Sequence, residues 1–144
     1  MTFEECAQFA KQHPVCQMAT LDGGQPRVRV MLMAEADNDG FWFATLSPKA
    51  VSRQIHARPG IEACFFNGAQ DPAGWVMMRV TGSAEFVKDG PMVKRVAQER
   101  AGLSQVVGEP IDKYLEVFRL RTGEVRFWRV TNLMKEDKAE VLRF

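Results

Sequence analysis

The chain has 144 residues, 46% hydrophobic and 26% charged, which fits one globular domain rather than two. Its 19 Lys and Arg residues nearly balance 18 Asp and Glu residues, so no overall positive field favours nucleic acid as a partner. No stretch approaches the ~18 apolar residues that span a bilayer and the N-terminus is charged throughout, so we expect a cytoplasmic protein with no membrane partner.

The first part of the chain predicts a helix followed by an antiparallel meander. Thr2 and Glu5 have capping-box spacing, and apolar residues follow at helical intervals, which predicts a helix over 2–12. Strands are expected over residues 15–21, 27–36 and 41–45. Turns that would join these strands occur at Asp22-Gly23-Gly24-Gln25 and Asp37-Asn38-Asp39-Gly40.

The middle of the chain predicts a second helix and two more strands. Ser47 is expected to cap a helix that has Pro48 as its first residue and ends near Ala57. The two strands are expected over residues 61–67 and 75–87. Gly82, inside the second of them, predicts a bulge or bend that curves the sheet.

The last part predicts a helix over 91–101, a hairpin around Thr122-Gly123 and a short strand near 139–143. The hairpin would pair residues 115–120 with 124–130. Because the strands do not alternate strictly with helices, the pattern indicates an α+β domain built on an antiparallel barrel.

One predicted strand places two arginines on the same side. Side chains alternate across a strand, so one face carries Arg27, Arg29, Met31 and Met33, and the other carries Val28, Val30 and Leu32. A solvated outer face explains this pattern. An anionic ligand with an apolar body also explains it, because arginine binds phosphate through two hydrogen bonds and methionine packs against rings.

The next helix start adds a second feature typical of phosphate binding. Thr45 ends a strand, Ser47 caps the expected helix, and Lys49 lies in its first turn. Free N–H groups and the helix dipole attract anions there, whereas a lysine is unfavourable unless an anion neutralises it. Lys49 therefore indicates a nearby phosphate; the alternative is an exposed lysine tolerated at a small cost.

No nucleophile-elbow, P-loop or dinucleotide-binding motif is present. Cys6, Cys16 and Cys64 are odd in number and outside any C-x-x-C pattern, which favours free thiols over disulfides or a metal site. His13 and His56 are expected in surface or capping positions. No catalytic side chain can be assigned, so a cofactor is expected to carry any chemistry.

Five segments occur in a characteristic order: Gly-Gln-Pro-Arg-Val-Arg, Asp-Gly-Phe-Trp-Phe-Ala-Thr, Ser-Pro-Lys-Ala with Arg-Gln-Ile, Val-Thr-Gly-Ser-Ala-Glu, and Glu-Val-Arg-Phe-Trp. With them, the chain from about Val15 to Val130 resembles the pyridoxamine 5′-phosphate oxidase-like family of FMN-binding split barrels, in its small general stress protein branch. The resemblance implies an antiparallel split β-barrel that works as a homodimer, with FMN bound at the subunit interface.

Arg27 is a candidate cofactor-binding residue because it shares a strand face with Arg29, and the resemblance implies the others. The full set of candidates is Arg27, Arg29, Val30, Met31, Leu32, Thr45, Ser47, Lys49, Met77 and Trp128. It implies that residues 29–32 line the flavin with their backbone and that Arg29 holds part of the phosphate. Thr45 and Lys49 would complete the phosphate site, with Ser47 at the entry to its helix. Trp128 would reach the flavin held by the other subunit. Met77 stands where the oxidases carry a glutamine that approaches the flavin.

Two departures from the oxidases argue against oxidation of vitamin B6. Ala34 replaces a lysine, and the residues after Trp128 lack an arginine-x-histidine pair for the substrate's phosphate. The first hypothesis is therefore an FMN-dependent oxidoreductase acting on another small molecule, with the deazaflavin F420 as an alternative cofactor. The second is a non-catalytic flavin-binding stress or sensor protein. The third is a barrel that binds nucleic acid through Arg27, Arg29 and the aromatic residues 41–43.

Overall fold

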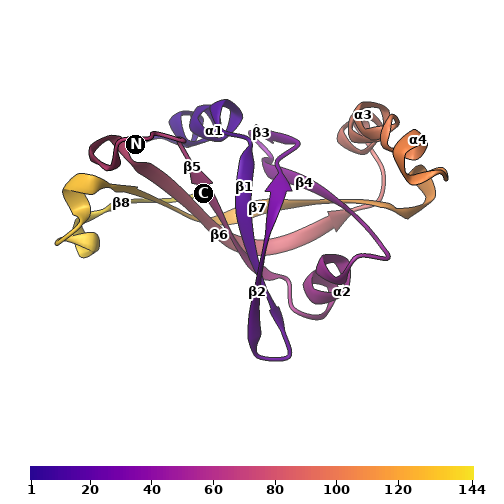
Figure 1. Cartoon of the computed structure of the whole chain (residues 1–144), viewed down its shortest axis with the longest axis horizontal. Coiled ribbons are helices and arrows are strands. Elements are labelled where there is room, and N and C mark those ends of the chain that lie inside the picture. The colour runs from indigo at the N-terminus through magenta and orange to yellow at the C-terminus, as the bar shows by residue number, and fades with distance from the viewer.

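The computed structural model describes all 144 residues as one sheet with four α-helices and short 3₁₀ turns (Figure 1). The helices are α1 (Phe3–Gln12), α2 (Ala50–Ala57), α3 (Pro91–Arg100) and α4 (Leu103–Val107). The strands are β1 (Val15–Asp22), β2 (Gln25–Leu32), β3 (Glu35–Asp37), β4 (Gly40–Leu46), β5 (Gly60–Phe66), β6 (Val76–Val87), β7 (Leu115–Arg129) and β8 (Glu140–Arg143). None of the helices combines the length and the apolar character required to cross a membrane.

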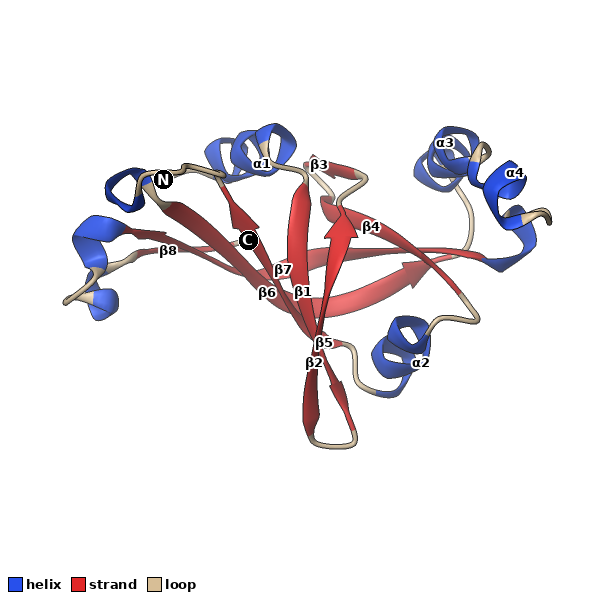
Figure 2. Cartoon of the chain, in the orientation of Figure 1, coloured by secondary structure: helices blue, strands red, loops and turns tan.

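The sheet is antiparallel and does not close. Neighbouring strands follow the order β2-β1-β5-β6-β7-β4-β3, and β8 pairs with β7. Figure 2 shows the twisted sheet with the helices at its rim and the tip of the β1–β2 hairpin projecting beyond it. Because β2 has a strand neighbour on one side alone, its other edge is free. The expected α+β split barrel is confirmed.

The split arises where the predicted strand 27–36 breaks into β2 and β3. Met33 donates its N–H to the Pro14 carbonyl (2.8 Å), and Ala34 donates its N–H to the Trp42 carbonyl (2.8 Å). Between these two residues the chain therefore leaves the β1 side of the sheet and joins β4. The prediction of one continuous strand is wrong, and neither a glycine nor a proline marks the break in the sequence.

The predicted hairpin around Thr122-Gly123 is also wrong, because residues 115–129 form a single long strand, β7. One edge of β7 pairs with β6, and the other pairs first with β4 and then with β8. Gly123 lies opposite Gly82, where the register shift confirms the expected bulge. A Cβ atom on Gly123 would lie 2.0 Å from the Thr81 carbonyl oxygen. Gly123 thus allows two strands to approach closely and does not form a turn.

The second helix begins later than predicted. It starts at Ala50, and no side chain caps it. Ser47 and Pro48 lie instead in a turn that is closed by a hydrogen bond from the Lys49 N–H to the Leu46 carbonyl (2.9 Å). Serine and proline occur in turns, here as the second and third of four residues, as well as at helix starts, so spacing alone does not distinguish the two.

The other predicted elements agree with the structure to within one residue at each end, and the capping box of α1 between Thr2 and Glu5 is present. The main core lies inside the curved sheet and includes Phe41 and Phe43. Trp42 is buried on the other side of β4 against Val96 of α3. The three aromatic residues of the nucleic-acid hypothesis are therefore packed in the interior and cannot stack on bases.

The close approach at Gly123 yields a stability prediction. Gly123→Ala should lower the free energy of unfolding by about 1–3 kcal/mol, because the added methyl group would have to displace strand backbone. Gly60→Ala is the matched control, since nothing lies within 4 Å of a Cβ atom at this strand position, and it should change stability by less than about 0.5 kcal/mol. Urea denaturation measures both. Equal losses would contradict a steric limit at Gly123.

Candidate functional site

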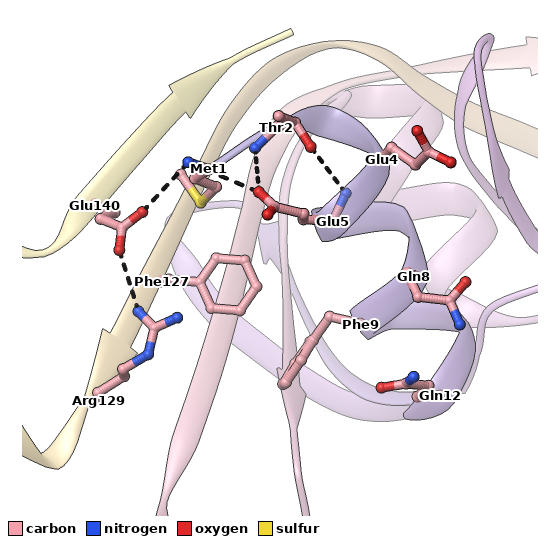
Figure 3. Close-up of a pocket in the computed structure, with 10 residues that line it drawn as sticks. All are labelled: Met1, Thr2, Glu4, Glu5, Gln8, Phe9, Gln12, Phe127, Arg129 and Glu140. Carbon is pink, nitrogen blue, oxygen red and sulfur yellow. Dashed lines mark hydrogen bonds and ion pairs between the residues drawn. The ribbon is translucent and has the colours of Figure 1, made fainter.

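The largest hollow, of about 790 Å³, lies between α1 and the ends of β7 and β8 (Figure 3). Its charged groups pair with one another. The N-terminal amine lies 3.7 Å from the carboxylates of Glu5 and Glu140, and Glu140 lies 3.5 Å from the Arg129 guanidinium. Glu4 adds a third carboxylate to the lining. This hollow disfavours an anionic ligand, and none of the predicted site residues lines it.

A second pocket, of about 180 Å³, lies in the gap between the free edge of β2 and the end of β4. Eight of its 11 lining residues are hydrophobic, and the others are Thr45, Lys49 and Arg100. An apolar wall with a few convergent polar groups suits a flat ring that carries an anionic group. The volume is below the ~300–1,000 Å³ of pockets that bury such ligands. The pocket of a single chain is therefore too small to enclose a ligand of that kind.

Thr45 and Lys49 form the polar end of this β2–β4 pocket. Thr45 is 4% exposed, and its hydroxyl has no hydrogen-bond partner in the chain. Leaving a buried polar group unsatisfied costs ~1–3 kcal/mol, so such a hydroxyl is normally paired with water or a ligand. Lys49 is exposed at the position directly before α2. The pair can donate a hydrogen bond and a positive charge to the same anion.

The structure brings half of the predicted residues together. The pocket is lined by Val30, Met31, Leu32, Thr45 and Lys49. Ser47 lies outside it and donates its N–H to the Tyr114 carbonyl (2.8 Å). Arg27 lies in the β1–β2 hairpin, where its guanidinium is 3.7 Å from the Asp22 carboxylate.

Arg29 also lies outside the pocket lining, although its neighbours Val30 and Met31 belong to it. Its guanidinium turns toward α2 and donates hydrogen bonds to the Met18 carbonyl (3.1 Å), the Thr20 hydroxyl (2.7 Å) and the Gln54 carboxamide (2.6 Å). Burial lowers the pKa of Arg29. All three acceptors are neutral, so Arg29 forms no ion pair with them, and the Asp22 carboxylate joins the network only through Gln54.

Met77 and Trp128 lie opposite each other on β6 and β7, away from the pocket of their own chain. Cross-strand pairs nevertheless connect them to β2. Val30 lies opposite Gln17, Gln17 opposite Cys64, and Cys64 opposite Arg79. Met77 is two residues from Arg79 and therefore points to the same face of the sheet.

This outer face is unusually apolar at its β2 end. Val28 and Val30 are each 65% exposed and Leu32 is 43% exposed, whereas the same strand buries Met31. At the other end Trp128 is half-buried, while the adjacent Phe127 belongs to the core. Because side chains alternate along a strand, Trp128 faces outward where Phe127 faces the core. The β2 stripe and Trp128 thus share one outer face of the sheet.

Sequence reasoning missed six lining residues: Ala44, Leu46, Arg100, Leu103, Ile111 and Leu115. Ala44 and Leu46 flank Thr45 in a strand that was predicted, so their place beside it was accessible from the sequence. The other four come from α3, α4, the segment before β7 and the first residue of β7. No motif marks them, and tertiary packing alone brings them to the gap.

The chain's own titratable groups offer little chemistry at this pocket, which contains no carboxylate, histidine or thiol. All three cysteines are free, and burial raises the pKa of Cys16 to about 12 and of Cys6 to about 11, so both thiols stay protonated. His56 stacks on Phe86 outside the pocket. The pocket can therefore bind and orient a ligand, but it offers no acid, base or nucleophile of its own.

The sequence of residues 2–129 matches the family model described as pyridoxamine 5′-phosphate oxidase. A search of curated proteins gives no significant sequence match. Several solved structures resemble this fold.

A NimC/NimA family protein from Clostridium acetobutylicum has a TM-score of 0.74 at 21% identity, over 99% of this chain and 92% of that one. HutZ, a heme storage protein from Vibrio cholerae, has a TM-score of 0.62 at 16% identity, over 84% and 90%. A FAD-binding protein from Mesorhizobium loti has a TM-score of 0.66 at 20% identity, over 88% and 94%. At such identities the likeness shows a shared fold.

Proposed function

This chain belongs to the pyridoxamine 5′-phosphate oxidase family, and from that premise we propose that it binds FMN in the β2–β4 pocket and works as a flavin-dependent oxidoreductase on a small molecule. The observation that carries the proposal is the polar end of the pocket. Thr45 presents a buried hydroxyl without a partner, and Lys49 presents a cation where α2 begins. A phosphate group accepts hydrogen bonds and charge from such donors.

The rest of the pocket fits the ring of a flavin. Val30, Leu32 and Leu103 offer apolar side chains on both sides of the gap. The free edge of β2 leaves backbone N–H and C=O groups unpaired, and these can hydrogen-bond the polar edge of the ring. When bound, FMN supplies hydride or electron exchange. The protein's part is to hold the phosphate, orient the ring and keep water from one of its faces.

Heme is a second candidate ligand, because HutZ shares the fold and stores heme. Heme iron is held by an axial His, Cys, Met or Tyr side chain. Of these four residue types the pocket contains only Met31, which is 5% exposed and part of the core. The lysine and the unpaired hydroxyl fit a phosphate-bearing cofactor better than a heme.

The same pocket serves two variants of the proposal. F420 also carries a ring and phosphate, so the identity of the bound cofactor separates it from FMN. A non-catalytic flavin-binding protein needs no acid or base, and the pocket contains none. An oxidoreductase should oxidise reduced nicotinamide or another electron donor faster than free flavin does. The non-catalytic variant should not.

We further propose that the protein is a homodimer in which the outer faces of two sheets meet. Each chain exposes the apolar stripe of Val28, Val30 and Leu32, and its pocket is too small to enclose a flavin alone. A twofold axis buries an exposed patch twice, once in each copy. With Trp128 on the same face, this arrangement lets the tryptophan of one chain cover the flavin held by the other.

Lys49→Ala should weaken FMN binding by about tenfold to a hundredfold, because a charge-assisted hydrogen bond to phosphate contributes ~1.5–3 kcal/mol. Riboflavin lacks the phosphate and should lose less than about twofold. Lys88→Ala, which removes an exposed lysine outside the pocket, is the control and should leave both affinities unchanged. Fluorescence titration measures all six constants. Equal losses for FMN and riboflavin in Lys49→Ala would remove the phosphate assignment.

Trp128→Ala should weaken FMN and brighten the emission of the flavin that still binds, because a nearby indole quenches it. Mixing tests whether the tryptophan acts across the interface. A heterodimer of Lys49→Ala and Trp128→Ala chains would contain one intact site, with lysine from one chain and tryptophan from the other. High-affinity FMN sites should therefore reappear on mixing. If both parents are dimers that exchange subunits and no such site returns, Trp128 does not serve the partner's flavin.

A further inference from the structure

Gln54 of α2 lies at the centre of a buried polar network beneath β2. Its side chain is 4% exposed. The carboxamide oxygen accepts hydrogen bonds from the Arg29 guanidinium (2.6 Å) and the Thr20 hydroxyl (2.7 Å), and the amide nitrogen donates to Asp22 (3.3 Å). Only this orientation satisfies both ends of the amide, because Arg29 is a donor and a carboxylate is an acceptor. Gln54 is thereby fixed by three partners.

The network holds Arg29 without neutralising it. Arg29 Nη1 donates to the Met18 carbonyl and the Thr20 hydroxyl, and Nη2 donates to Gln54. A guanidinium has five N–H groups. One on Nη2 and one on Nε therefore remain without an acceptor in the chain. Neighbouring N–H groups of this kind bind phosphate through two parallel hydrogen bonds.

Whether residue 54 is neutral or charged determines how much of the Arg29 charge is left for a ligand. A glutamate in the same place would form an ion pair with Arg29 and compete with any incoming anion, and it would also lose the hydrogen bond that Gln54 donates to Asp22. Glutamine provides the same geometry and leaves the positive charge uncancelled. The helix that carries Gln54 also begins directly after Lys49, so one short element sets the position of both cations.

We infer that Gln54 is a positioning residue that presents the guanidinium of Arg29, still charged, to the phosphate of the flavin. The inference rests on the proposed binding of FMN in the β2–β4 pocket. It extends that proposal from the residues that line the pocket to Arg29, which lies next to the lining residues Val30 and Met31, and to the neutral side chain that holds Arg29 in place.

The test compares FMN and riboflavin affinities in Gln54→Glu, in Arg29→Ala and in the double variant. Gln54→Glu should weaken FMN by about tenfold or more and riboflavin by less than about twofold, because only FMN needs the charge of Arg29. In the Arg29→Ala background the same substitution should have little further effect on FMN. Gln8→Glu makes the same charge change at an exposed position of α1 and should change neither affinity.

If Gln54 only stabilised the fold, the affinities would change differently. Equal weakening of both ligands by Gln54→Glu, or a full additional loss of FMN in the Arg29→Ala background, would overturn the inference. Should Gln54→Glu fail to fold by thermal unfolding, Gln54→Ala replaces it, and a selective loss of FMN is again the expected result. Failure of the wild-type chain to bind FMN at all would instead reject the proposed function.

Discussion

The free edge of β2 is the constraint on which the rest of this molecule depends. At Met33 and Ala34 the chain turns from β1 to β4, so the sheet curves like a barrel but leaves a gap. An unpaired strand edge is normally a liability that proteins cover or disrupt. Here the gap holds the β2–β4 pocket, and the outward side chains of the edge strand form an apolar stripe. The opening thus provides both the pocket for the proposed ligand and the apolar surface for the proposed dimer.

Helix α2 connects this gap to the rest of the sheet. On one side Gln54 bonds to residues of β1 and β2, and on the other His56 bonds to Glu116 of β7 (2.9 Å). Lys49 precedes the helix at the mouth of the pocket. A short helix held from both sides keeps the cationic end of the site at a fixed place relative to the strands. In the proposed function the protein contributes geometry and charge, and the flavin supplies the electron transfer.

Local signals allowed most of the fold to be predicted, because capping residues, glycine-rich turns and alternating strands act over a few positions. The two failures in the sheet have a common cause. The break at Met33 and the continuous path of β7 through Gly123 are determined by which strand lies alongside, and not by the local sequence. A glycine that admits a close strand and a glycine that forms a turn are indistinguishable in a single sequence.

Some residues of the candidate site could likewise be predicted from the sequence, and others could not. Val30 to Leu32, Thr45 and Lys49 lie near the ends of two predicted strands, and the family resemblance located them. Arg100 and Leu103 reach the pocket from a distant segment, and no sequence pattern indicated that they would line it. The position of Arg29 was predicted, but its neutral partners were not. Those partners belong to other elements and become visible only when the strands and α2 are packed together.

The most direct test of the central claim is the absorption spectrum of the freshly purified protein, followed by mass identification of any ligand released on denaturation. Binding of FMN in the β2–β4 pocket predicts flavin absorption bands and release of FMN at up to one molecule per chain. Protein isolated without cofactor should regain those bands when FMN is added. A Soret band with released heme, or a colourless protein that does not bind added FMN, would contradict the proposal.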